Sequence, residues 1–191
     1  MIAILTTLGA LSTFQAPTHE QMVYEDLVDQ ATFNCPRIGD PYKVNQKLLW
    51  DLVKIEKEYG VPPIYRGMLL AAACYESGYN PNAKGDRKFS KKRKPKSLGI
   101  LQFWRWAEKY IDRTDPIASA RFWLKRIKRQ IPFIKKRCRY KSKKRIWLAA
   151  WVTAIRYPKK SGRCYEKPKH YYLLRKWKRA IKKNRKKGCS C

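Results

Sequence analysis

The chain has 191 residues, of which 44% are hydrophobic and 13% aromatic. This length and composition allow one domain with a real core, and they argue against a second domain and against a fully disordered chain. Its 45 Lys and Arg residues against 14 Asp and Glu give a formal net charge of +31, which favours anionic partners such as nucleic acid, anionic lipid or acidic cell-wall polymers without choosing among them.

The first twelve residues are uncharged and mostly apolar. About ten apolar residues are too few for a membrane span, which needs about twenty. They fit the apolar region of a secretory signal peptide, with Ala10-Leu11-Ser12 as a small-x-small cleavage site. We therefore expect a signal peptide over residues 1–16, a secreted or periplasmic location, and an N-terminal extension over residues 17–40. Because no Lys or Arg precedes the apolar region, a short N-terminal helix or a disordered start is the alternative.

The next elements all read as helices. Asp40-Pro41 is a helix-capping pair followed by apolar residues at helical spacing, which predicts a helix ending at Gly60. Further helices are expected over 64–76, 98–110, 144–155 and 168–182, together with a long one that opens at Asp115-Pro116 and bends or ends at Pro132. The basic residues 84–96 read as an exposed loop. No alternating apolar run indicates a strand, so the predicted fold class is all-α.

Six cysteines are an even number, which suits disulfides in an exported protein, although six allow fifteen pairings. Cys74, in the apolar 64–76 helix, reads as a buried thiol or a disulfide partner more than as a nucleophile. The terminal Cys189 and Cys191 could instead form a metal or redox pair. With two histidines and no Cys-x-x-Cys, we expect no structural metal site and no cofactor.

Glu76 closes the 64–76 helix and is the candidate catalytic residue. Its neighbours one and two turns back are apolar, namely Ala73, Ala72, Leu69 and Met68. An apolar environment and the negative end of a helix dipole both favour the protonated carboxylic acid, which can donate to a glycosidic oxygen. The alternative is a glutamate at the helix end that faces solvent.

Two motifs follow, Glu76-Ser77-Gly78-Tyr79-Asn80-Pro81-Asn82-Ala83 and Ser97-Leu98-Gly99-Ile100-Leu101-Gln102. With them, residues 41–178 resemble the soluble lytic transglycosylase domain and its relative, the goose-type lysozyme. The resemblance implies a lysozyme-like single domain with a basic C-terminal helical extension and a basic, cysteine-containing tail over 179–191. One segment departs from the family, because Ala149-Ala150-Trp151-Val152-Thr153-Ala154 stands where the family carries Ala-Ala-Tyr-Asn-Ala-Gly.

The resemblance implies cleavage of the β-1,4 bond between N-acetylmuramic acid and N-acetylglucosamine, with a 1,6-anhydro product. Glu76 would be the single acid and base, and the substrate-binding residues would be Ser77, Tyr79, Gln102, Trp151 and Tyr171, with Tyr172 as the rival to Tyr171. Without the resemblance, Ser77 and Gln102 read as solvated helix residues. Either Trp104 or Trp106, but not both, is expected in a sugar-binding groove. A hydrolytic muramidase would need a second group, for which Asp86 is the candidate, although it also reads as a turn residue.

Basic residues gather in two segments. Residues 121–145 hold thirteen Lys and Arg with no acid, and residues 156–187 hold fifteen with one acid, Glu166. Interleaved aromatic residues are also typical of nucleic-acid surfaces. We interpret the segments as solvated faces that attract a monomeric enzyme to anionic cell-wall polymers and peptidoglycan glycan strands. A non-catalytic cationic protein that binds nucleic acid or the cell envelope, built on a decayed version of the fold, is the competing hypothesis.

Overall fold

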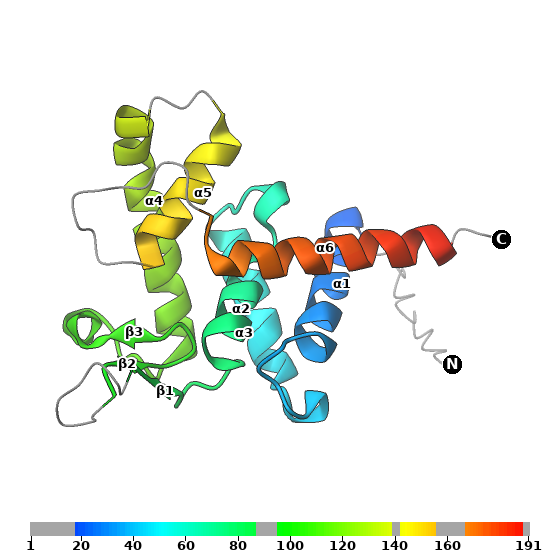
Figure 1. Cartoon of the computed structure of the whole chain (residues 1–191), viewed down its shortest axis with the longest axis horizontal. Helices are drawn as coiled ribbons and strands as arrows, with labels where there is room; N and C mark the ends of the chain where they lie inside the picture. Colours follow the sequence, from blue (N-terminus) through cyan, green and yellow to red (C-terminus); the bar gives the residue numbers. More distant parts are fainter. Residues whose placement is uncertain (1–17, 87–94, 139–141, 156–166, 189–191) are drawn as a thin grey trace, which may run out of the picture.

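The computed structural model describes residues 18–86, 95–138, 142–155 and 167–188 (Figure 1). It confirms a mainly helical chain. The α-helices are α1 His19–Phe33, α2 Gln46–Glu58, α3 Met68–Ser77, α4 Pro116–Cys138, α5 Lys143–Ile155 and α6 Lys169–Gly188. Short 3-10 helices cover Pro41–Lys43, Pro63–Tyr65 and Arg105–Lys109. None of the helices in the described ranges is long and apolar enough to cross a membrane. The predicted signal peptide and the end of the basic tail lie outside the described residues.

The predicted N-terminal extension contains α1, which the sequence analysis did not identify. Thr18 caps this helix by accepting a hydrogen bond from the Gln21 amide. The inward face of α1 carries Tyr24, Leu27 and Val28, and these side chains are buried in the same core as α2 and α3. The extension is therefore part of the folded core.

Two predicted helix starts were wrong. Asp40-Pro41 opens only a 3-10 turn, and Asn45 caps α2 by accepting the Leu48 amide at 3.0 Å. Gly67, at φ +85°, separates the 3-10 turn Pro63–Tyr65 from α3, so the predicted 64–76 helix begins later than expected. The opening of α4 was predicted correctly, but the helix continues through Pro132 to Cys138.

The predicted helix over 98–110 was also wrong, and so was the expectation of no strands. A three-stranded antiparallel sheet, with order β1-β2-β3, is built from Lys84–Gly85, Ser97–Leu98 and Phe103–Trp104. Lys84 pairs with Leu98, and Ser97 pairs with Trp104. The chain turns between β2 and β3 because Gly99 and Gln102 adopt positive φ, at +85° and +50°.

Helix α3 lies at the centre of the fold. All seven residues from 68 to 74 are buried, and α6 crosses both α3 and α1 (Figure 1). Helices α4 and α5 lie side by side next to this core, and the ring contact between Phe103 and Phe122 joins the small sheet to α4.

The N-terminus of α3 is capped by a glutamate from another helix. The fully buried carboxylate of Glu56, on α2, accepts the backbone N–H groups of Gly67 at 2.7 Å and Leu69 at 2.6 Å. Gly67 has no side chain to cap the helix, so Glu56 supplies the acceptors that the helix end requires. Burial raises the pKa of Glu56 to about 7, and burial also lowers the pKa of the nearby Lys178 to about 8.

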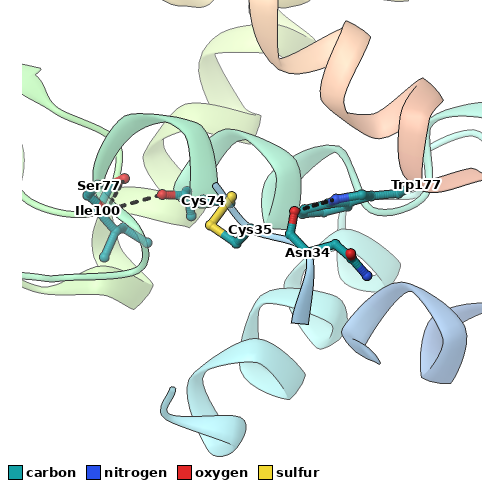
Figure 2. The surroundings of a disulfide bond; sticks show 7 residues. Asn34, Cys35, Cys74, Ser77, Ile100 and Trp177 are labelled. Carbon is teal, nitrogen blue, oxygen red and sulfur yellow. Dashed lines mark hydrogen bonds between the residues drawn. A yellow bond between two sulfur atoms is a disulfide. The ribbon is translucent and has the colours of Figure 1, made fainter. Parts of the chain in front are cut away.

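A disulfide bond also connects α3 to the segment that follows α1. Cys74 of α3 is bonded to Cys35, which follows α1, with their Cα atoms 5.7 Å apart (Figure 2). Beside this bond, the indole N–H of Trp177 donates to the Asn34 carbonyl at 3.2 Å and so brings α6 to the same point. Cys138 is also disulfide-bonded, and Cys164, Cys189 and Cys191 lie outside the described residues.

We predict that Glu56→Gln destabilises the protein more at pH 4.5 than at pH 8. The pKa of Glu56 in the folded protein is about 7, above its ordinary value of 4.5. The contribution of this group to the free energy of unfolding of the wild type is therefore complete below pH 4.5 and is lost as the pH rises through 7. Between pH 4.5 and pH 8 the free energy of unfolding of the wild type should therefore fall by roughly 3 kcal/mol through this group, and Glu56→Gln lacks this fall. Urea unfolding at both pH values measures it. Glu58→Gln, which removes an ion pair with Arg121, is the control, and its penalty should not shrink as the pH rises.

We predict that the double variant Cys35→Ala/Cys74→Ala lowers the free energy of unfolding by about 4 kcal/mol, because the bond closes a loop with a sequence separation of 39. Substitution is preferred to a reductant because Cys138 is disulfide-bonded as well. Urea unfolding without reductant makes the measurement. A loss below about 1 kcal/mol would show that the bond does not constrain the unfolded chain in this way.

Candidate functional site

Glu76 lies in the last turn of α3, where the helix emerges from the core. Its side chain is 26% exposed, whereas the helix before it is buried. Gly78 ends the helix at φ +63°, and its amide donates to the Cys74 carbonyl at 2.9 Å. Glycine adopts this left-handed conformation without a steric penalty, and it turns the chain away directly after the candidate acid.

The Glu76 carboxyl has a partner that the sequence analysis missed. The Nε2 atom of His170, on α6, lies 2.6 Å from Oε1 of Glu76, although the two residues are 94 positions apart. The imidazole is 4% exposed. It stacks on Trp151 with an interplanar angle of 27° and meets the edge of Tyr75 at 5.1 Å between ring centroids. The chain contains two histidines, and this small number was the one feature of the sequence that could have drawn attention to His170.

Ser77 connects the end of α3 to the turn between β2 and β3. Its hydroxyl lies 3.1 Å from the Ala73 carbonyl oxygen and 3.0 Å from the Ile100 carbonyl oxygen, and it can donate to either (Figure 2). The two motifs singled out in the sequence therefore meet in space. Within the described residues, the hydroxyl holds the backbone of the turn in place.

The side chain of Gln102 is used inside the protein. Its amide nitrogen donates to the Ala83 and Gly99 carbonyls at 2.9 and 2.8 Å, and its oxygen accepts the Ser97 hydroxyl at 2.8 Å. These bonds connect β1, β2 and the turn. The predicted sugar contact of Gln102 would have to compete with them. The predicted contact of Tyr79 meets a similar obstacle, because that side chain is buried.

Trp151 is fully buried, so the prediction that its ring stacks on a sugar does not fit the structure. The ring instead lies edge-on to Tyr65, Trp123 and Tyr171 and stacks on the imidazole of His170. Its aromatic character made core and binding surface indistinguishable in the sequence. Tyr171 is half-buried in this cluster, whereas the rival Tyr172 is exposed.

Of the two tryptophans expected near a groove, Trp104 is the exposed one. Its ring is 45% exposed, and its indole N–H donates to Asp86 at 2.9 Å. The Lys96 ammonium lies over the same ring, 5.7 Å from its centroid. Trp106 is half-buried against Phe122. Asp86, the candidate second carboxylate, thus binds Trp104 at the edge of the sheet.

No group of three or more His, Cys, Asp or Glu side chains in the described ranges is placed to hold a metal ion. No family model, no curated protein and no solved structure matches the chain. Beside the end of α3, the structure thus brings together Glu76, His170 and the turn that Ser77 holds.

We predict that Gly99→Ala disrupts this turn and lowers the free energy of unfolding by at least about 2 kcal/mol. A Cβ atom at Gly99 would lie 1.8 Å from the Arg113 carbonyl oxygen, and φ is +85°. Gly39→Ala is the matched control, because a Cβ there meets nothing within 4 Å. Thermal and urea unfolding of both variants would measure the difference, and equal losses would contradict the prediction.

Proposed function

We propose that the protein is a peptidoglycan lytic transglycosylase with a lysozyme-like fold, and that Glu76 is its catalytic acid and base. The observation that carries the proposal is a partly exposed carboxyl at the end of a buried helix, joined through Ser77 to the second motif of the resemblance. The Cys35–Cys74 disulfide supports a secreted or periplasmic location, where such bonds persist and where peptidoglycan lies.

In the proposed reaction, Glu76 donates its proton to the oxygen between N-acetylmuramic acid and N-acetylglucosamine, and the bond from that oxygen to the muramyl C1 breaks. The muramyl N-acetyl group stabilises the positive charge that develops at C1, as in substrate-assisted glycosidases. The Glu76 carboxylate then removes the proton of the muramyl C6 hydroxyl, whose oxygen bonds to C1 and closes the 1,6-anhydro ring. The acid is regenerated, and no water is consumed.

This route needs one carboxyl group, whereas a hydrolytic muramidase needs a second group to activate water. Asp86 is the sequence candidate for that second group, and its carboxylate already accepts the indole N–H of Trp104. The bond gives Asp86 a structural role at the sheet edge. It therefore favours the transglycosylase over the hydrolase.

A cationic binding protein is the second candidate, favoured by α6. Residues 182–187 of this helix are all exposed, and five of the six are Lys or Arg. Such a surface attracts anionic polymers in a salt-dependent manner. For the proposed enzyme, the same surface would hold the protein on anionic cell-wall polymers and increase its rate of association with them.

We predict that Glu76→Gln abolishes the release of anhydro-muropeptides from purified sacculi, with a loss of at least about 100-fold, because glutamine can neither donate nor accept the proton. Glu25→Gln is the matched control. That residue lies on α1 and accepts only the Gln21 amide within the described residues, a bond that glutamine retains. Mass spectrometry identifies the products.

Other results would change the assignment. Products with reducing ends, lost in Glu76→Gln, would identify a hydrolase. Absence of any product from the wild type, together with salt-sensitive retention of DNA or teichoic acid, would identify a cationic binding protein.

A further inference from the structure

The Glu76–His170 contact has no role in the reaction as described above. The catalytic scheme requires one carboxyl group, and nothing in the sequence motifs refers to a histidine. His170 nevertheless lies 2.6 Å from one of the two carboxyl oxygens, Oε1. The other oxygen, Oε2, accepts no hydrogen bond from the described residues. The two oxygens of the acid are therefore not equivalent.

The surroundings of the imidazole favour a neutral ring with its hydrogen on Nε2. The Nδ1 atom is buried and has no hydrogen-bond partner among the described residues. A charged ring would bury an unpaired N–H at Nδ1, whereas the neutral ring leaves only an unused acceptor there.

The groups around the ring come from α3, α5 and α6 and from the segment that follows α1. Helix α3 contributes Glu76 and the half-buried Tyr75, and the Arg37 guanidinium lies over the Tyr75 ring, 5.7 Å from its centroid. On α6, the preceding Lys169 is exposed. Helix α5 presents the uncharged ring of Trp151. Glu76 is therefore the group that His170 contacts by a hydrogen bond.

We propose that His170 is a positioning residue for Glu76: as a neutral donor it holds Oε1, so that Oε2 carries the proton to the glycosidic oxygen and later receives the proton of the C6 hydroxyl. The inference rests on the proposed function. A donor at Oε1 also stabilises the carboxylate that forms as the proton leaves, so the hydrogen bond strengthens along the reaction.

Two variants separate a positioning role from a structural one. His170→Phe keeps an aromatic ring between Trp151 and Tyr75 but removes the donor. His170→Gln supplies a neutral N–H donor in its place. We expect kcat on sacculi to fall about 10- to 100-fold in His170→Phe, the loss typical of one hydrogen bond to a charged group. KM should change by less than about threefold, and His170→Gln should recover most of kcat.

The pH profile gives a readout that packing alone would not move. The reaction begins with protonated Glu76, so activity is lost as the pH rises and the carboxylate forms. Removing a donor that stabilises the carboxylate should therefore shift this alkaline limb of kcat to higher pH in His170→Phe. In His170→Gln the limb should lie near that of the wild type.

Nitrogen-15 NMR of the histidine rings tests the neutral donor without substrate. The chain has only two histidines, and the exposed His19 is an internal reference. We expect the spectrum recorded at the pH of the activity assay to show a protonated Nε2 and an unprotonated Nδ1 in His170. A doubly protonated His170 ring, or a proton on Nδ1 alone, would overturn the inference.

The outcomes distinguish this inference from the proposed function. An active wild type with full activity and an unshifted profile in His170→Phe would overturn the positioning role alone, as would His170→Gln failing as badly as His170→Phe. A wild type that releases no anhydro product would overturn the proposed function, and the positioning role with it. Circular dichroism and unfolding of both variants establish that they are folded.

Discussion

The carboxylate of Glu56 holds the N-terminus of α3, and the rest of the structure depends on that contact. A helix that is buried along its length cannot leave its first N–H groups to water, so other parts of the protein must supply acceptors. Gly67 brings no side chain, and Glu56 reaches across from α2 to accept two of these N–H groups. Burial of a carboxylate is costly, as its raised pKa shows, and the two backbone hydrogen bonds offset part of that cost.

Helix α3 is fixed at three points by three different segments. Glu56 holds its start, Cys35 is bonded to its seventh residue, and His170 contacts the glutamate at its end. The end of α3 therefore meets the first turn of α6 through this side-chain contact. The candidate acid therefore lies where contacts from distant parts of the chain converge, and its geometry depends on the whole fold.

The end of α6 carries exposed basic residues, whereas Lys178 of the same helix lies near the buried Glu56. The core around α3 is filled by aliphatic side chains and by buried aromatic side chains that include Trp123, Trp151 and Trp177, while the Lys and Arg residues of α6 beyond residue 181 are exposed. A net charge of +31 destabilises a compact chain through self-repulsion. Disulfides and a dense core counteract this repulsion.

The sequence alone determined the mainly helical class, the opening of α4 at Asp115-Pro116 and the position of Glu76 at a helix end, because capping and apolar periodicity are local properties. It did not determine the chain at 98–110, where the left-handed conformation of Gly99 and the internal bonds of Gln102 replace the expected helix with a turn between strands. Nor could it find Glu56 or His170 as partners, since periodicity shows which face of a helix is buried but not which distant group will contact it. Trp151 makes the same point: an aromatic side chain suits a sugar or a core equally well, and only the packing of α5 against His170 and Tyr65 decided between them.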